Sequence, residues 1–311
     1  MTTSEMVASV AGDAVPLISV VIPAYNYGHL LPRALDSVFV QWAGDIELIV
    51  VDDGSLDDTP AVLAEYESRY PGLCIIRQDN AGAAAARNRG IREARGPYVL
   101  LLDADDELLP EALGVLRSLV QKNPQAGMFL GAQVSVYADG RERLRLPSPV
   151  PAGSPVQLAR RYLLEKRISI SHCCSLFRRS LLLERPYPES LRTGEDIPVF
   201  AYLLVSAPVI TTREPLARIY KHSDSQRHNR VDEEHYAQLM LAEVFSSLPA
   251  ECASLRNRYE SQRYLSLFRS ALLASDRTQA QRFYLRALRL SPMQALRWSY
   301  VRKALRLLLK P

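Results

Sequence analysis

Two apolar segments of this chain run directly into acidic residues. These residues are Asp103, Asp105 and Asp106 after the segment 98–102 (YVLLL), and Asp52 and Asp53 after the segment 46–51 (IELIVV). Carboxylates gathered at one place repel one another unless a cation lies among them. Mg²⁺ or Mn²⁺ fits an all-oxygen site that leaves room for phosphate groups. The pattern therefore indicates a divalent metal site, provided that the two segments end near each other.

Each acidic segment also has an interpretation without a ligand. Residues 105–107 stand just before a predicted helix, and a helix N-terminus favours negative charge. The stretch DDGS (52–55) has the composition of a turn. Either segment alone fits a structural role equally well, so the chemical interpretation depends on the two occurring together.

Strands alternate with helices through the first two thirds of the chain. Apolar runs at 17–24, 46–51, 73–77, 98–102, 128–136 and near 169–177 predict strands, and 29–40, 59–70, 82–94, 110–122, 156–167 and 195–206 predict helices. This alternation predicts an α/β fold with a mostly parallel sheet covered by helices on both faces. Ligands of such open sheets bind beyond the carboxyl ends of the strands, where the acidic residues stand.

The charge is distributed unevenly along the 311 residues. The net charge is +4, yet residues 256–311 carry 13 Lys and Arg against two acidic residues. We therefore expect a flexible tail at 1–15, a catalytic domain at 16–230 and a basic helical region at 231–311. The four cysteines fit neither a zinc pattern nor a disulfide framework, which favours a reducing, cytoplasmic setting. No apolar stretch approaches the length of a transmembrane helix.

Five short motifs occur in a fixed order along the chain. They are SVVIPAYN (19–26), VVDDGS (50–55), NAGAAAARNRG (80–90), LLDADD (101–106) and GED (194–196). As a set, over about residues 17–225, they resemble the family 2 glycosyltransferases, which have the GT-A fold. The resemblance implies inverting transfer of a sugar from a nucleoside-diphosphate sugar to an acceptor hydroxyl.

The resemblance also implies which residues bind the donor. The residues that match the loop lining the nucleotide base are Pro23, Ala24 and Tyr25. Asp53, together with Asp52, matches the acidic pair that reads the base and ribose; a carboxylate can accept from the N–H of a pyrimidine. This edge is shared by UDP- and dTDP-sugars, which are the expected donors, and GDP-mannose stays open as an alternative. Arg87 matches the arginine near the nucleotide, although a solvated helix face also fits it.

The D-x-D motif of the family corresponds to Asp103 and Asp105 here. The expected division is Asp105 to the metal and Asp103 to ribose or metal-bound water, with Asp106 as a substitute ligand. Breaking the sugar–phosphate bond leaves a diphosphate with extra negative charge. A divalent cation, Mg²⁺ or Mn²⁺, stabilises that leaving group.

Inversion needs a base on the opposite face of the sugar to take the proton of the attacking hydroxyl. The pair Glu195-Asp196 matches the family's E-D motif at a predicted helix start. We assign Asp196 as the base and Glu195 to the acceptor or to positioning. The alternative is that the pair caps the helix.

Three further residues follow from the resemblance. His172 matches a strand that faces the sugar and acceptor, although a core histidine with satisfied hydrogen bonds fits equally well. His222 and Arg227 match the segment that closes the domain, where relatives contact the metal or the diphosphate.

The basic C-terminal region has two interpretations. Residues 277–311 carry nine Lys and Arg and no acid, interleaved with Leu, Trp and Tyr at helical spacing. Such helices suit the surface of an anionic membrane, which would place the protein at the inner face of the cytoplasmic membrane. The same helices could instead pack on the catalytic domain. No nucleic-acid motif accompanies the charge, so no nucleic-acid partner is expected.

A membrane-surface region would suit a glycan or lipid-linked acceptor, in bacterial cell-surface polysaccharide or lipopolysaccharide synthesis. One rival is a nucleotidyltransferase, but the loop 23–28 lacks the basic residue which that class needs. The other is a non-catalytic sugar-nucleotide-binding protein, against which the intact D-x-D and E-D motifs argue.

Overall fold

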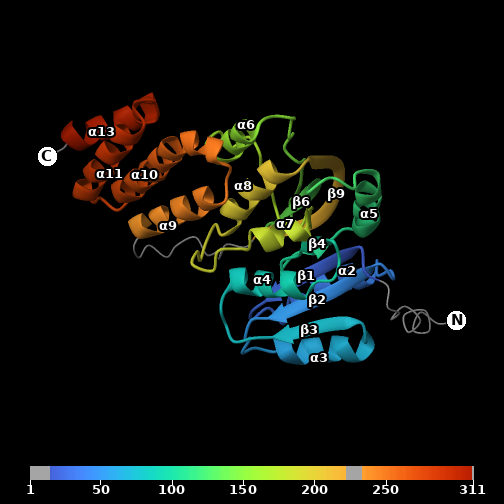
Figure 1. Ribbon diagram of the computed structural model, residues 1–311. Coiled ribbons are helices and arrows are strands. Elements are labelled where there is room, and N and C mark those ends of the chain that lie inside the picture. The colour runs from blue at the N-terminus through green and yellow to red at the C-terminus, as the bar shows by residue number, and fades with distance from the viewer. Residues whose placement is uncertain (1–14, 222–232, 310–311) are drawn as a thin grey trace. The chain divides into compact units, whose positions relative to one another are not determined.

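The computed structural model describes residues 15–221 and 233–309, which divide into two compact units (Figure 1). The described parts of 1–152 and 168–226 form the first unit, and those of 153–167 and 227–311 form the second. The expected domain boundary at 230 lies outside the described residues. The sequence did not predict that the insertion 153–167 groups with the C-terminal helices.

One sheet organises the first unit. Its strand order is β3-β2-β1-β4-β8-β6-β9-β5, with β7 paired to β6. The parallel half comprises β1 (Ile18–Ala24), β2 (Ile46–Asp52), β3 (Leu73–Arg77) and β4 (Tyr98–Leu101). These strands occur where the apolar runs predicted them, and the α/β class is confirmed.

The other half of the sheet is mixed. It comprises β5 (Glu107–Leu108), β6 (Met128–Tyr137), β7 (Glu142–Arg145), β8 (Ser175–Arg178) and β9 (Val209–Lys221). β8 is shorter than the expected strand at 169–177, and β9 was not predicted at all. Pro215 inside β9 argues against a strand by sequence, but it lies at an irregularity of the β6–β9 register, where a missing N–H is tolerated.

Helices cover both faces of the parallel strands. The helices of this unit are α2 (Leu31–Phe39), α3 (Thr59–Arg69), α4 (Ala83–Glu93), α5 (Ala112–Lys122), α7 (Arg179–Glu184) and α8 (Asp196–Ser206). Alternate β1 residues such as Val20 share a buried cluster with Leu35 of α2. Val21 points to the opposite face, where Gly90 of α4 comes so close that an added Cβ would lie 2.3 Å from Cγ1 of Val21. The glycine that ends the motif NAGAAAARNRG thus allows α4 to approach the sheet.

The second unit is helical. It contains α6 (Pro155–Ala159), the π-helix η1 (Arg160–Leu164), α9 (Glu233–Ser246), the 3₁₀ helix η2 (Ala250–Leu255), α10 (Arg256–Leu273), α11 (Arg277–Leu290), α12 (Pro292–Ala295) and α13 (Trp298–Leu309). Its core includes Phe268 of α10 and Phe283 of α11. Gln262 of α10 donates to the carbonyl of Leu164 at 2.9 Å, which ties the insertion to this unit. Among the described residues, no helix combines the length and the apolar character needed to cross a membrane.

Candidate active site

The acidic segments meet at one edge of the sheet because β1 lies between β2 and β4. At the end of β1, Ala24 pairs with Asp52, and the carbonyl of Ala24 accepts from the N–H of Asp53 at 2.8 Å. On the other side of β1, the N–H of Leu102, directly after β4, donates to the carbonyl of Val21 at 3.0 Å. β2 and β4 therefore end at the same edge of the sheet with only β1 between them, which is the proximity that the metal-site prediction required.

Asp53 is buried and already holds the loop before α4. Its carboxylate accepts from Nε2 of Gln78 at 2.7 Å and from the N–H groups of Ala81 and Gly82 at 2.9 and 2.8 Å. A carboxylate has about four acceptor positions, so about one remains for a base. The side chain positions the N-terminus of α4, a role that the sequence did not predict.

Asp52 is also buried, and both its oxygens have partners. One accepts from the N–H of Ser55 at 2.9 Å, and the other lies 3.6 Å from Nε of the exposed Arg77. Tyr25, at the end of β1, is exposed, whereas Ala24 is buried within the strand. At this edge Tyr25 is therefore accessible to a ligand, whereas Asp52 and Asp53 are almost fully buried.

The loop after β4 gathers two carboxylates around a thiol. Sγ of Cys173 lies 3.1 Å from Oδ2 of Asp106 and 3.6 Å from Oδ2 of Asp103. One ligand atom from each of these three residues lies within 4.8 Å of the others, and the carboxylate of Asp105 is not part of this group. Oxygen donors at this spacing fit a hard divalent cation. Adjacent cysteines in a predicted strand gave no indication of this contact.

Arg33 of α2 also contacts this loop. Its guanidinium donates to the backbone carbonyl of Asp105 and lies 3.6 Å from the ring centroid of Tyr220 in β9. The N–H of Tyr220 in turn donates to Oδ1 of Asp106 at 2.9 Å. Both residues were missed by sequence reasoning, because nothing in their spacing relates them to the acidic motif.

Arg87 joins the acidic loop to the pair at 195–196. It is 7% exposed, which excludes the solvated-face interpretation. Its guanidinium contacts Glu195 at 2.7 Å and Asp103 at 3.2 Å. Its Cζ also lies 5.7 Å from the ring centroid of Tyr187, a residue that the sequence did not single out. The neighbouring Asn88 fixes that tyrosine, since its amide bonds both the N–H and the carbonyl of Tyr187 at 2.8 Å.

Glu195 and Asp196 stand at the beginning of α8 and differ in their surroundings. Glu195 is engaged by Arg87, as described above. Burial and the charge of Glu195 raise the pKa of Asp196 above its usual value, and Arg87 partly offsets this rise. A carboxylate with a raised pKa takes up a proton more readily, which is the property required of a general base.

His172 lies on the core side of this network. One ring nitrogen is 3.0 Å from the hydroxyl of Tyr187, and the ring centroid lies 4.9 Å from that of Phe200. Burial and the nearby Arg87 lower the pKa of His172 to about 3, so the ring is neutral at physiological pH. His222 and Arg227, the other two residues expected from the closing segment, lie outside the described residues.

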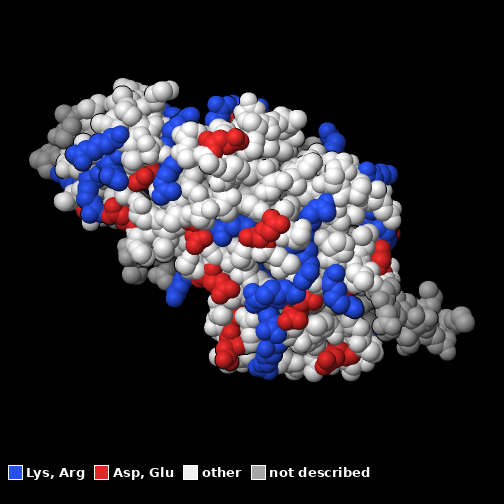
Figure 2. All heavy atoms as spheres, viewed as in Figure 1, with Lys and Arg blue, Asp and Glu red and all other residues white. Residues whose placement is uncertain are grey.

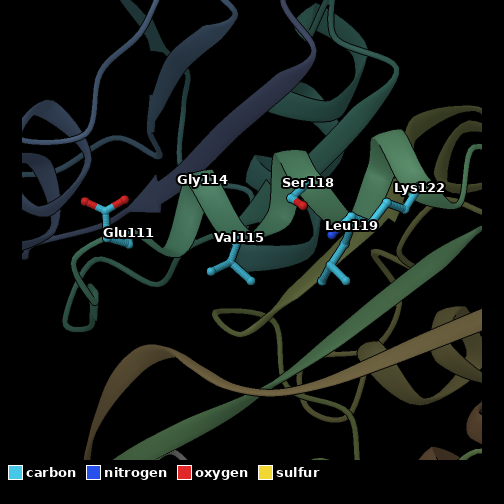
Figure 3. A pocket seen from close by; sticks show the side chains of 6 residues that line it. All are labelled: Glu111, Gly114, Val115, Ser118, Leu119 and Lys122. Atoms are coloured by element: carbon cyan, nitrogen blue, oxygen red, sulfur yellow. The ribbon is translucent and has the colours of Figure 1, made fainter.

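A surface hollow elsewhere in this unit does not belong to the site. It runs along α5 and is lined by Glu111, Gly114, Val115, Ser118, Leu119 and Lys122 (Figure 3). None of the predicted site residues lines it. The candidate active site is therefore the edge that carries the carboxylates rather than this hollow.

The pKa of Asp106 supplies a prediction for the metal-free protein. Burial and the charge of Asp103 raise this pKa from 3.8 to about 7. Between these values the folded protein keeps a proton that the unfolded chain has lost, so stability falls as pH rises. The asparagine side chain of Asp106→Asn has no such proton to lose. We therefore expect the free energy of unfolding of this variant to fall less than that of the wild type between about pH 4 and pH 7.

Urea unfolding in EDTA, followed at Trp42 in the same unit of Trp298→Phe proteins, measures this difference. Asp139→Asn, at an exposed position, is the control and should follow the wild-type pH dependence. A stability difference between Asp106→Asn and wild type that stays constant with pH would contradict the shifted pKa.

Curated relatives match parts of the chain. It is 28% identical over 227 residues to chondroitin synthase of Escherichia coli, which covers 73% of this chain and 30% of that protein. It is 32% identical over 207 residues to the succinoglycan biosynthesis protein ExoO of Rhizobium meliloti, with 62% and 57% covered. The chain thus spans less than two thirds of the length of both relatives.

Solved structures share the fold. TarS 1-349 of S. aureus in complex with UDP-GlcNAc has a TM-score of 0.68 at 19% identity, covering 89% of this chain and 82% of that one. The mannosyltransferase PcManGT of Pyrobaculum calidifontis, in complex with GDP-Man and Mn²⁺, has a TM-score of 0.53 at 16% identity, covering 95% and 85%. These likenesses confirm the GT-A fold.

The family comparison covers the parallel strands, the acidic loop and the arginine that joins it to α8. Residues 19–185 match the sequence model described as "Glycosyl transferase family 2", which is more than half of the chain. With the motifs gathered at one edge of a GT-A sheet, the chain belongs to glycosyl transferase family 2.

Proposed function

We propose that this chain transfers a sugar from a nucleoside-diphosphate sugar to a hydroxyl group of a glycan or glycolipid, with inversion and with a divalent cation. The observation that carries the proposal is the contact of Arg87 with both Asp103 and Glu195. This contact joins the acidic loop, which suits a cation and a diphosphate, to the start of α8, which supplies a base. A donor bound between them would meet both groups.

The donor half of the site is the edge formed by β1, β2 and β4. Tyr25 is exposed there, with Pro23 and Ala24 in the strand before it and Asp52 and Asp53 beside it. The complexes of TarS with UDP-GlcNAc and of PcManGT with GDP-Man support a nucleotide sugar as the ligand. Among nucleotide sugars we favour a UDP- or dTDP-sugar, because the acceptor position that remains on the acidic pair suits the N–H of a pyrimidine.

Asp103 and Asp106, whose carboxylates lie in one group, would hold Mg²⁺ or Mn²⁺, and Asp105 of the D-x-D motif would join them if its side chain turned toward them. The cation would stabilise the charge that develops on the departing diphosphate. Arg33 fixes the loop through the carbonyl of Asp105, and Tyr220 fixes Asp106. These contacts keep the carboxylates in place while the charge at the site changes.

Asp196 would take the proton from the acceptor hydroxyl as its oxygen attacks the anomeric carbon. The proton moves to Oδ of Asp196, the new bond forms from the acceptor oxygen, and the bond from carbon to the diphosphate breaks. Arg87 holds the neighbouring Glu195 in an ion pair at 2.7 Å. The similarity to ExoO and to chondroitin synthase supports an acceptor in cell-surface polysaccharide synthesis.

The decisive experiment combines donor binding with turnover. A thermal-shift panel of UDP-, dTDP- and GDP-sugars with Mn²⁺ should single out one nucleotide, since a ligand at 100 times its Kd stabilises the fold by about 2.7 kcal/mol. Release of nucleoside diphosphate from that donor should stop in EDTA and return with excess Mg²⁺ or Mn²⁺.

Two results would contradict the proposal. Binding without any release of nucleoside diphosphate, with every acceptor and in water alone, would indicate a sugar-nucleotide-binding protein. Release of pyrophosphate from a nucleoside triphosphate and a sugar phosphate would indicate a nucleotidyltransferase.

A further inference from the structure

Large apolar side chains are exposed at the end of the helical unit. Met293 is 85% exposed, Leu296 59%, Trp298 72% and Leu305 45%. Single exposed hydrophobic residues are normal on any protein, but several within one short segment make that segment a candidate interaction surface. All four fall within thirteen consecutive residues that span most of α12, the connection after it and most of α13.

α13 has an inner and an outer side. Tyr300, Ala304 and Leu307 pack against the core of the unit. Trp298, Arg302 and Leu305 follow one another at spacings of four and three residues, so they form one stripe on the outer side. Arg302 is exposed within this stripe, as is Arg306 beside it. The outer side is thus both apolar and basic.

The sequence segment that carries this stripe has charged side chains of one sign only. Residues 277–311 contain nine Lys and Arg and no Asp or Glu, so α12 and α13 offer their arginines no carboxylate side chain of their own. In α11, Arg282 and Arg286 are paired with Glu234 of α9 and Glu260 of α10. In the view of Figure 2, Lys and Arg atoms gather where Figure 1 labels α10 and α11, with some Asp and Glu atoms among them.

This composition selects among the partners that could cover the surface. A second copy of the chain, meeting it face to face, would bring the same positive charge against it. Nucleic acid would satisfy the arginines but would leave the exposed Met and Leu side chains in water. An anionic bilayer satisfies both, because its headgroups are negative and its interface accepts Trp and Leu.

We propose that Met293, Leu296, Trp298 and Leu305, with Arg297, Arg302 and Arg306, form a docking surface for an anionic lipid bilayer. We name these seven residues the α12–α13 surface. The Trp298 and Leu305 side chains enter the headgroup region, and the arginines reach back to the lipid phosphates along their own alkyl stems. The surface lies within the second unit alone, and its binding does not depend on the transfer reaction proposed above.

The chain offers its own spectroscopic reporter. It has two tryptophans, Trp42 and Trp298. Trp42 is packed on Phe39, with ring centroids 4.8 Å apart, in the first unit. In full-length Trp42→Phe protein the emission therefore comes from Trp298. We expect a blue shift when vesicles containing phosphatidylglycerol are added, and quenching when those lipids carry bromine on their acyl chains.

Matched variants separate charge from apolar contact. Arg302→Gln/Arg306→Gln should weaken partitioning to anionic vesicles about thirtyfold, whereas Arg141→Gln/Arg143→Gln, at exposed positions of the first unit, should leave it unchanged. Leu296→Ser should weaken binding by roughly tenfold, and Val40→Ser, at a residue that is 81% exposed in the first unit, should not. Raising the salt concentration should release the wild-type protein.

Three results would overturn the proposal. The first is an unchanged Trp298 spectrum at saturating anionic vesicles. The second is a shift of equal size with vesicles of phosphatidylcholine alone. The third is a blue-shifted spectrum without vesicles that reverts on dilution, which would mean that a second copy covers the surface. Trp298→Phe protein, which reports through Trp42, should show no shift in any arm.

Discussion

Asp196→Asn should lower kcat by about 10²–10⁴-fold while leaving donor affinity within a factor of about three. The amide keeps the shape of the side chain but cannot take the proton of the acceptor hydroxyl. Donor binding should not depend on this charge, because the carboxylates proposed to bind the donor lie at the β1, β2 and β4 edge. Steady-state kinetics with the donor found in the thermal-shift panel, together with donor titration, measures the two quantities separately.

Two variants test whether this effect belongs to Asp196. Asp139→Asn removes an exposed carboxylate of the same unit and should keep wild-type kcat. Glu195→Gln loses the ion pair with Arg87 and should reduce kcat less than Asp196→Asn does. If Asp196→Asn instead retained turnover within tenfold of wild type while Glu195→Gln lost it, the base would be Glu195.

The raised pKa of Asp196 adds a pH signature. Below this pKa the carboxylate is protonated and cannot act as a base, so kcat/KM should fall about tenfold per pH unit on the acid side. Because burial and Glu195 raise the pKa, this fall should begin at a higher pH than for an ordinary carboxylate. In Glu195→Gln, which removes a neighbouring negative charge, the acid limb should move to lower pH.

Arg87→Met should destabilise the first unit by about 3 kcal/mol and abolish transfer. The guanidinium is the shared partner of Glu195 and Asp103, so its loss leaves both carboxylates without a positively charged side chain beside them. Breaking a buried ion pair costs about 3–5 kcal/mol, and the low end applies because the Asp103 side chain is 36% exposed. Urea unfolding in a Trp298→Phe background, followed at Trp42, reports on this unit alone.

α4 supplies the matched control for Arg87. Arg89 lies two positions further along the helix and pairs with Glu93 at 3.1 Å, with both side chains about half exposed. Arg89→Met should change stability by less than about 0.5 kcal/mol and should leave kcat unchanged. Equal unfolding curves for Arg87→Met and Arg89→Met would show that the network does not hold the site together.

Part of the fold could be predicted because its pattern is local. The apolar runs at β1, β2, β3 and β4 and the helical spacing between them are written in neighbouring residues, and the structure confirms them. β9 escaped prediction because Pro215 argues against a strand until the irregular β6–β9 pairing is known. The assignment of 153–167 to the helical unit likewise depends on contacts such as Gln262 with Leu164, which no local pattern encodes.

By itself, the sequence determined which carboxylates end the strands and which acidic pair begins α8, because strand ends and helix starts leave short-range patterns. Only the tertiary structure decided how these groups are held. Arg87 meets Glu195 across 108 positions of the chain, and Cys173 meets Asp106 across 67. Arg33 and Tyr220 fix the acidic loop from two further elements. Such contacts arise from packing between elements, and residue spacing carries no record of which elements become neighbours.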